Sequence, residues 1–354
     1  MDITGNTDTA SPTYNHFRDK IILVTGGAGA IGRNLTERLS VLGAKLVIVF
    51  DNLSSSYLWN IPDSPNVLFV KGDIRNDNDL RRVFHHKPEL IFHLAAFFAN
   101  QNSVDYPLVN EEVNIAGMLK LLEYCQISGS VERFVFANSE GGVYGVETNL
   151  PHREDDITLN LATPYYISKL AGEAYCRYYH SYYGLPVSIV RLFNSYGPGE
   201  VPGQYRNVIP NFIYWAMKGL ALPLTGNAEM ARDFVYVDDT INGLLSAAVA
   251  AEALGNAVNI CSGKLINIHD LAGQINQLTG NSAGVRLIPN RKWDVRNQIL
   301  GDPGKAKEII GFEAKTNFND GLIKTISWFQ NNWDVICRDA EFPPGRSAAH
   351  SNIL

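Results

Sequence analysis

The sequence predicts an α/β fold, in which a doubly wound parallel sheet is joined by a smaller mixed lobe at the C-terminal end. Two observations support this prediction. Short apolar runs alternate with stretches of helical spacing between residues 19 and 195, which is typical of parallel strands covered by helices on both faces. A glycine-rich turn directly follows the first apolar run and opens the first helical stretch.

The strands and helices of the first part follow one another in turn. Runs such as KIILVT and KLVIVF are short, apolar and β-branched, which indicates buried strands, and Ile31, Leu35, Leu39 and Leu42 share one helical face. On these grounds strands are expected at 20–25, 45–50, 67–70, 90–94, 133–137 and 186–192, and helices at 31–42, 109–128 and 164–183.

The pattern changes after Asn194, where prolines and glycines cluster in YGPGEVPGQYRNVIP. Beyond it we expect helices at 210–219, 238–254 and 321–331, and strands at 234–237 and 257–260. We therefore divide the chain into a first domain at 19–195 and a substrate lobe at 196–337, with segments such as 234–262 returning to the first domain. The polar ends, 1–18 and 338–354, are expected to be flexible tails.

Composition excludes several classes of protein. The net charge of −6 over 354 residues argues against a nucleic-acid or anionic-membrane surface. No apolar run reaches the roughly 20 residues of a membrane helix, and the N-terminus shows no signal region. The four cysteines are isolated, which suggests free thiols rather than a disulfide or a metal site. We expect a cytoplasmic protein without a bound metal.

The glycine-rich turn, TGGAGAIG, satisfies the pattern of a Rossmann-type dinucleotide site. Gly26, Gly29 and Gly32 permit a tight turn, and the backbone N–H groups of the following helix face a pyrophosphate. Asp51 ends the second strand, 19 residues beyond Gly32, where an acid binds ribose hydroxyls and repels a 2′-phosphate. The sequence therefore predicts NAD rather than NADP as the cofactor.

Further cofactor contacts are expected where successive parallel strands end, because those ends meet at one edge of the sheet. The first helical residues after the turn are one such group. An acid and an isoleucine that follow the third strand are placed to contact the adenine. Small residues after the fourth strand would let the cofactor lie flat against the sheet. These residues are Ala30, Ile31, Asn52, Asp73, Ile74, Leu94, Ala95 and Ala96.

A candidate acid–base pair lies on the long helix expected at 164–183. Tyr165 and Lys169 stand four residues apart and so share a face. A nearby ammonium lowers the pKa of a phenol and makes it a usable base at neutral pH. Ser139, just after the fifth strand, is placed to hydrogen-bond the same substrate oxygen.

These motifs together resemble the extended short-chain dehydrogenase/reductases of the nucleotide-sugar epimerase/dehydratase family. The motifs TGGAGAIG, DNL, GDI, HLAA, VYG, YYISK, RLFNSYGPG and RDFVYVDD carry the resemblance over about residues 20–335. It implies a Ser139, Tyr165 and Lys169 triad, with the tyrosine and lysine also contacting the cofactor. It further implies roles for Asn114 beside the triad and cofactor, for Asn194, Arg232 and Arg291 at a sugar diphosphate, and for Asn207 and Asp294 at the nucleotide.

The resemblance favours a redox-neutral 4-epimerase that acts on a UDP-sugar of the glucose/galactose, N-acetylhexosamine or uronic-acid type. It also implies a homodimer formed through the helices at 109–128 and 164–183. Glu140 follows Ser139 where such epimerases usually have glycine, and it is counted among the substrate-binding residues. A UDP-glucuronate decarboxylase or a 4,6-dehydratase that uses Glu140 therefore stays open, as does a Glu140 that points to solvent. A net oxidoreductase and a non-catalytic NAD sensor are the remaining alternatives.

Overall fold

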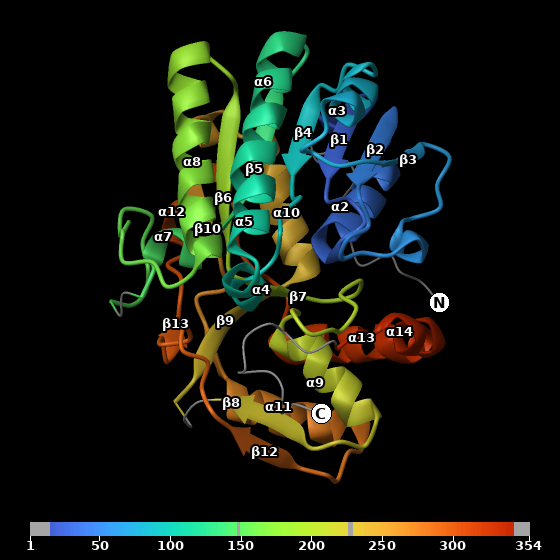
Figure 1. Cartoon of the computed structure of the whole chain (residues 1–354), viewed down its shortest axis with the longest axis vertical. Coiled ribbons are helices and arrows are strands. Elements are labelled where there is room, and N and C mark those ends of the chain that lie inside the picture. Colours follow the sequence, from blue (N-terminus) through green and yellow to red (C-terminus); the bar gives the residue numbers. More distant parts are fainter. Residues whose placement is uncertain (1–14, 147–148, 226–228, 343–354) are drawn as a thin grey trace.

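The structure is a computed structural model that describes residues 15–146, 149–225 and 229–342. A large sheet with its helices forms the upper part of the view in Figure 1, and a smaller lobe lies beneath the ends of its strands. No helix in these ranges is long and apolar enough to cross a membrane.

The large sheet confirms the predicted fold class. Seven strands, all paired in parallel, lie in the order β10-β6-β5-β4-β1-β2-β3. The order reverses beside β1, where an open sheet of this kind leaves a crevice for a ligand. The strands are β1 (Ile21–Thr25), β2 (Leu46–Asp51), β3 (Val67–Lys71), β4 (Leu90–His93), β5 (Arg133–Ser139), β6 (Val187–Leu192) and β10 (Ala257–Ile260).

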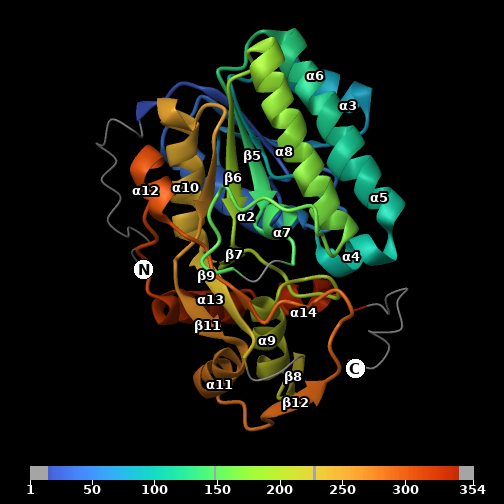
Figure 2. The same cartoon turned by 90° about the vertical axis from the view of Figure 1, so that its left-hand side faces the viewer.

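Helices cover both faces of this sheet, as Figure 2 shows. Alternate residues of β1 point to opposite faces, so Ile22 and Val24 join one buried cluster while Leu23 joins the other. The first cluster includes apolar residues of α2 (Ala30–Val41) and α10 (Val237–Val249). The second includes those of α3 (Asp77–Phe84), α6 (Met118–Ser128) and α8 (Pro164–Tyr183).

The helix expected at 109–128 is interrupted. It consists of α5 (Pro107–Glu111), a π-helical segment η2 (Glu112–Gly117) and α6. Within this stretch Asn110 donates to the Pro164 carbonyl at 3.1 Å, and Asn114 donates to the Ser168 hydroxyl at 3.1 Å. The π-helical segment therefore lies where the helix is tied to α8, a contact that hydrophobic periodicity does not reveal.

The smaller lobe is built on two short sheets and several helices. One sheet joins β7 (Asn194–Tyr196), β9 (Ala231–Tyr236), β11 (Leu265–Asn267) and β13 (Gln298–Ile299), and the other pairs β8 (Leu222–Thr225) with β12 (Val285–Ile288). Its helices are α9 (Val208–Met217), α11 (Ile268–Thr279), α13 (Phe318–Asn331) and α14 (Trp333–Asp339). Three short helices were not predicted: α4 (Asn100–Asp105) and α7 (Gly141–Tyr144) pack on α8, and α12 (Gly304–Ile310) packs on α10 and β10.

Three expectations about boundaries need correction. The segment 234–236 belongs to β9 in the small sheet, so the chain returns to the large sheet only with α10 and β10. Residues 15–18 are no tail, because Phe17 is completely buried in the core. Residues 338–342 are no tail either. Arg338 and Asp339 end α14, and the ring of Phe342 packs on the rings of Tyr214 and Trp215. The rest of both expected tails lies outside the described residues.

Candidate active site

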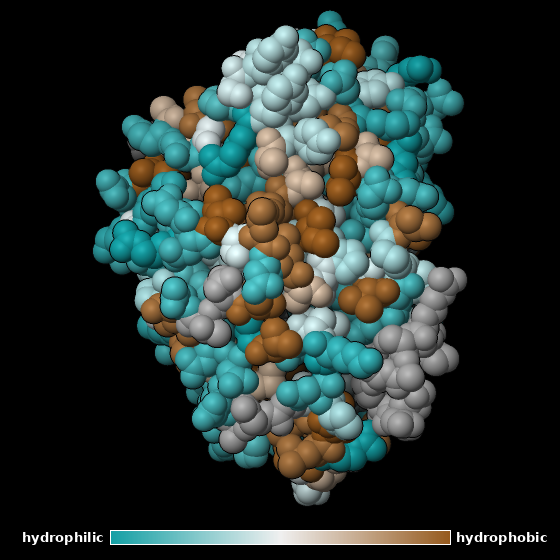
Figure 3. All heavy atoms as spheres, turned by 60° about the vertical axis from the view of Figure 1, so that its left-hand side comes forward, coloured by the Kyte–Doolittle hydropathy of each residue, from teal (hydrophilic) through white to brown (hydrophobic). Residues whose placement is uncertain are grey.

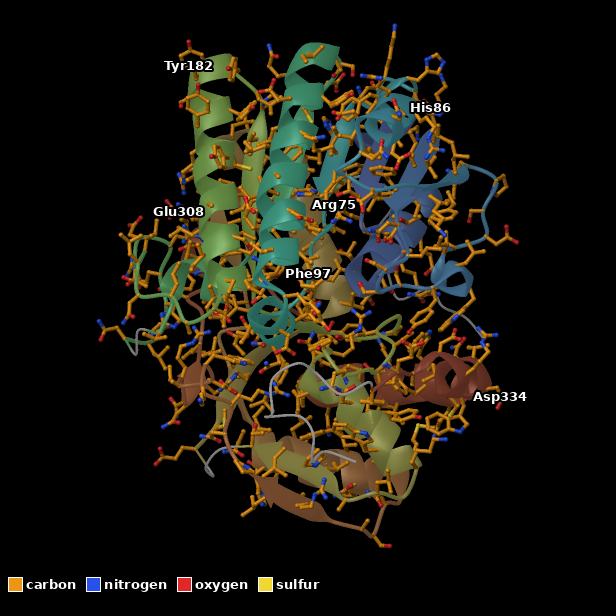
Figure 4. The ribbon with its side chains drawn as sticks, in the orientation of Figure 1. Arg75, His86, Phe97, Tyr182, Glu308 and Asp334 are labelled. Atoms are coloured by element: carbon orange, nitrogen blue, oxygen red, sulfur yellow. The ribbon has the colours of Figure 1, made fainter. Side chains whose placement is uncertain are left out.

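A cavity opens where the strands of the large sheet end, and the smaller lobe closes its other side. Its walls include the glycine-rich turn, the ends of β2 to β5, the start of α8 and the segment 194–200. A second cavity adjoins it and is lined mainly by the smaller lobe. Figure 4 labels Phe97, a wall residue, at the level where the two parts meet.

The glycine-rich turn leaves no room for side chains. Gly26 has φ +69°, and a Cβ added to it would lie 2.7 Å from the backbone nitrogen of Ala95. A Cβ on Gly32 would lie 2.3 Å from the carbonyl oxygen of Gly26. Gly29 precedes α2, no side chain caps its N-terminus, and the turn and Ala30 and Ile31 line the cavity. This cradle at a helix N-terminus fits a pyrophosphate.

Asp51 is held rigidly at the end of β2. It accepts the backbone N–H of Ala28 at 3.1 Å and of Leu53 at 2.8 Å, and the hydroxyl of Ser56 at 2.8 Å. The carboxylate lines the cavity beside Asn52. Its position next to the turn fits the predicted contact with the cofactor ribose.

Asp73 closes β3 within a small polar cluster. It accepts from Asn52 at 2.9 Å and pairs with Arg75 at 2.8 Å. Hydrogen bonding from Arg75 lowers the pKa of Asp73 to about 2. Asp73 and Ile74 line the cavity, as do Leu94, Ala95 and Ala96 after β4.

Asn114 lies behind the cavity wall instead of in it. Its amide oxygen accepts the N–H of Phe97 at 2.7 Å, and its nitrogen donates to Asn110 at 2.9 Å and to Ser168. The side chain is only 6 % exposed and is absent from the cavity lining. The cofactor contact expected of Asn114 stays a prediction; in the structure the residue ties the loop after β4 to α8.

Ser139, Tyr165 and Lys169 meet in the first cavity. The Ser139 side chain hydrogen-bonds Tyr165, and the Lys169 ammonium lies 5.7 Å from the centre of the Tyr165 ring while donating to the Ala137 carbonyl at 2.8 Å. Thr163 caps α8 by accepting the Tyr166 N–H, which fixes the start of the helix.

The pKa of Tyr165 departs from the sequence expectation. Burial raises it, and the neighbouring Tyr166 and Glu140 raise it further, whereas only the bond from Ser139 lowers it. Burial also lowers the pKa of Lys169 to about 8. In the protein alone, desolvation therefore outweighs the expected effect of the ammonium on the phenol.

Glu140 does not point to solvent. It is 6 % exposed, lines both cavities and forms a two-pronged ion pair with Arg296, with distances of 2.9 and 3.2 Å. Arg296 also donates to the Tyr166 hydroxyl at 3.0 Å, and Asn100 donates to that oxygen at 3.1 Å. Arg296 and Glu140 are 156 residues apart, and no sequence pattern marked Arg296 as a site residue.

The second cavity brings together the residues assigned to the sugar nucleotide. Arg232, Arg291, Asp294 and Asn207 line it, and Asn194 lines both cavities. Arg232 pairs with Asp294 at 3.0 Å. Burial lowers the pKa of Arg291, whose guanidinium lies 5.6 Å from the centre of the Trp293 ring. Two cations facing one cavity fit a diphosphate.

The side chains of Asn194 and Asn207 are each held by a hydrogen bond that they donate. Asn194 donates to the Asp233 carbonyl at 3.1 Å, and Asn207 donates to Glu200 at 2.9 Å. Sequence reasoning missed Glu200, a buried carboxyl whose pKa is raised to about 7 by desolvation. No group of three or more His, Cys, Asp or Glu side chains within the described ranges is arranged to hold a metal.

Comparison with known proteins identifies the family. The profile of the NAD dependent epimerase/dehydratase family matches residues 22–261. The chain belongs to this family. A UDP-glucose 4-epimerase of Mycolicibacterium smegmatis is 33% identical over 312 residues, which cover 87% of this chain and 98% of the relative.

Solved structures agree with this membership. The epimerase Mth375 of Methanothermobacter thermautotrophicus has a TM-score of 0.92 and 49% identity, over 93% of this chain and 98% of that one. The Bordetella bronchiseptica enzyme WbmF, solved with NAD+ and UDP, has a TM-score of 0.80 and 37% identity, over 92% and 96%. As a member of this family, the chain is an enzyme with NAD as its cofactor, and the NAD prediction is confirmed.

Proposed function

We propose that the chain is a UDP-sugar 4-epimerase that works through a transient 4-keto sugar. The observation that carries the proposal is the meeting of Ser139, Tyr165 and Lys169 in the cavity that also contains the glycine cradle. A proton acceptor beside a site for a hydride acceptor is what oxidation of a sugar hydroxyl requires.

In this proposal Tyr165 removes the proton of the 4-hydroxyl, and Ser139 bridges the same oxygen. NAD held at the glycine cradle would supply the hydride acceptor for this oxidation at C4. Lys169 contributes its positive charge beside the phenol, and it also binds the nicotinamide ribose. Because burial raises the pKa of Tyr165, this charge is needed most at the moment the phenol loses its proton.

The nucleotide half of the substrate is assigned to the second cavity. Arg232 and Arg291 bind the diphosphate with Asn194, while Asp294 and Asn207 bind the nucleoside. The M. smegmatis relative is a UDP-glucose 4-epimerase and WbmF was solved with UDP, which supports a UDP-sugar.

Dehydration and decarboxylation are less well supported than epimerisation. Dehydratases of the family place an Asp-Glu pair after the catalytic residue, whereas here Glu140 and Gly141 follow Ser139. Glu140 is therefore a single acid in place of that pair, and it forms an ion pair with Arg296. A pentose product from UDP-glucuronate would nevertheless establish decarboxylation.

We also propose a homodimer formed through α5, α6 and α8. These helices expose large apolar side chains, among them Leu108 (74%), Ile127 (74%), Ile167 (54%) and Tyr182 (70%). Figure 3 shows hydrophobic side chains along the middle of the face that comes forward with α8. Light scattering after gel filtration tests this expectation. The cytoplasmic location stays a prediction of the sequence.

One incubation tests the proposed activity. The purified protein is mixed with UDP-glucose, UDP-N-acetylglucosamine or UDP-glucuronate without added NAD, and the products are followed by NMR. A product inverted at C4 supports the proposal. Stoichiometric reduction of added NAD would instead indicate a net oxidoreductase, and near wild-type turnover by Tyr165→Phe would refute the assignment of the base.

A further inference from the structure

A second set of polar side chains faces the sugar end of the first cavity and takes no part in the chemistry at C4. Glu140 and Tyr166 line both cavities, and Arg296 lies between them and bonds to both. The three side chains are 6, 5 and 5 % exposed. Removing such groups from water is costly, so their presence beside Ser139 and Tyr165 calls for a chemical role.

The hydrogen bonds of Tyr166 determine which way its proton points. Its hydroxyl oxygen accepts from Arg296 at 3.0 Å and from Asn100 at 3.1 Å, and a hydroxyl has only two acceptor positions. The O–H bond is therefore left to donate elsewhere, and the side chain lines the cavities. Burial raises the pKa of Tyr166, so the phenol keeps its proton at neutral pH.

Glu140 offers the complementary group. Arg296 engages both of its oxygens, and each oxygen retains a lone pair for another donor. The carboxylate is close enough to Tyr165 to raise the pKa of that phenol. Because it directly follows Ser139 and lines the same cavity as Ser139 and Tyr165, it lies near the position at which the 4-keto group would form.

We propose that Glu140 and Tyr166, coupled by Arg296, form a second acid–base pair that exchanges and inverts the hydrogen on a carbon next to C4 of the keto sugar. The inference rests on the proposed function, because only a keto group at C4 makes the hydrogens on its neighbouring carbons acidic. It adds epimerisation beside C4 to the C4 chemistry.

The step balances as a transfer of protons. A Glu140 oxygen takes the proton from the carbon, the C–H electron pair forms a double bond to C4, and the displaced carbonyl pair moves to O4, which accepts hydrogen bonds from Ser139 and Tyr165. Tyr166 then donates its proton to the other face of the carbon while the carbonyl re-forms. Water returns Tyr166 and Glu140 to their starting states.

Arg296 is a positioning residue in this scheme. Before the transfer its guanidinium pairs with the Glu140 carboxylate, and after the transfer it pairs with the Tyr166 phenolate. The positive charge of Arg296 therefore has one negative partner throughout. Moving the charge between two groups that the same guanidinium already touches avoids leaving an unpaired buried ion.

The test follows solvent hydrogen into the sugar. The full-length protein with its bound NAD is incubated in deuterium oxide with UDP-glucose, UDP-N-acetylglucosamine or UDP-glucuronate. NMR locates deuterium in the recovered sugar, and the product inverted at C4 reports that the keto sugar has formed. We expect deuterium at C3 or C5 with inversion at that carbon.

Variants assign the groups through the ratio of deuterium incorporated at C3 or C5 to sugar inverted at C4. Glu140→Gln should lower this ratio about 100-fold or more. Tyr166→Phe should keep exchange and lose inversion, because Glu140 can return its proton only to the face it came from. Glu154→Gln is the matched control, since Glu154 is 7 % exposed, lies outside the lining of both cavities and accepts the Asn259 N–H at 2.8 Å, a bond that the glutamine carbonyl can keep; it should leave the ratio unchanged.

Three results would overturn the inference. Inversion at C4 without deuterium at C3 or C5 in the wild type refutes the second acid–base pair while leaving the C4 chemistry intact. An unchanged ratio in Glu140→Gln refutes the role of Glu140. No product inverted at C4 with any of the three sugars refutes the proposed function and this inference with it.

Discussion

Replacing Gly32 by alanine should separate the role of the glycine cradle from that of the surrounding fold. The new methyl group would lie 2.3 Å from the Gly26 carbonyl oxygen and 2.6 Å from the Gly27 Cα. Both are backbone atoms, so no flexible side chain can move aside. Reaching an ordinary contact of about 3.4 Å requires α2 to shift by roughly 1 Å against the turn.

Overpacking of this kind costs about 1–3 kcal/mol. Because the same shift misaligns the N–H groups at the start of α2, we expect NAD affinity to fall about 10-fold or more, at 1.4 kcal/mol per tenfold. Urea unfolding of the NAD-free protein measures the first effect. The NAD retained after gel filtration, read by absorbance, measures the second.

Gly273→Ala is the matched control. A Cβ on Gly273, in α11, would meet nothing within 4 Å. Alanine is favoured over glycine within a helix by about 0.5–1 kcal/mol, so this variant should be slightly stabilised and should keep its NAD. If Gly32→Ala unfolds at the wild-type urea midpoint and retains a full equivalent of NAD, the assignment of the cradle is wrong.

Three further changes have defined outcomes. Tyr165→Phe should lower turnover about 100-fold or more while NAD stays bound, as measured by NMR and absorbance. Folding lowers the pKa of Lys169 from 10.5 to about 8, so between pH 8 and 10.5 the unfolded chain binds more protons than the folded protein. The free energy of unfolding of the NAD-free protein should therefore rise with pH over this interval. Urea unfolding curves measure this rise, and Lys169→Met should abolish it. Arg191→Met leaves the buried Glu173 with only Asn138 and the half-exposed Arg177 among the partners described here, and should cost about 3–5 kcal/mol in the same assay, whereas an unchanged midpoint would contradict the buried pair.

Features encoded within short stretches of sequence were predictable. The glycine turn, Asp51 and the Tyr165–Lys169 spacing lie where expected, because each depends on one strand end or one helix face. The long helix was predicted at 164–183 and is found with those bounds, since Thr163 caps it and Gly184 ends it in a left-handed conformation.

Features that depend on distant contacts were not predictable. Arg296 reaches Glu140 across 156 residues, so Glu140 read as an isolated carboxylate in a loop. Phe17 and Phe342 were assigned to tails because their neighbours are polar, yet each ring is taken up by a surface formed elsewhere in the chain. The pKa of Tyr165 depends on how completely the site is dehydrated, and periodicity carries no information about that.

The return of the chain to β10 has a consequence for how the protein can be divided. β10 covers the free edge of β6, and α10 covers the same face as α2. A fragment that stops at residue 195 would expose an apolar face and the unpaired N–H and C=O groups of an edge strand, which invite aggregation. The part of the chain that holds the dinucleotide is therefore not a unit of folding, and we expect both halves to unfold in one cooperative transition.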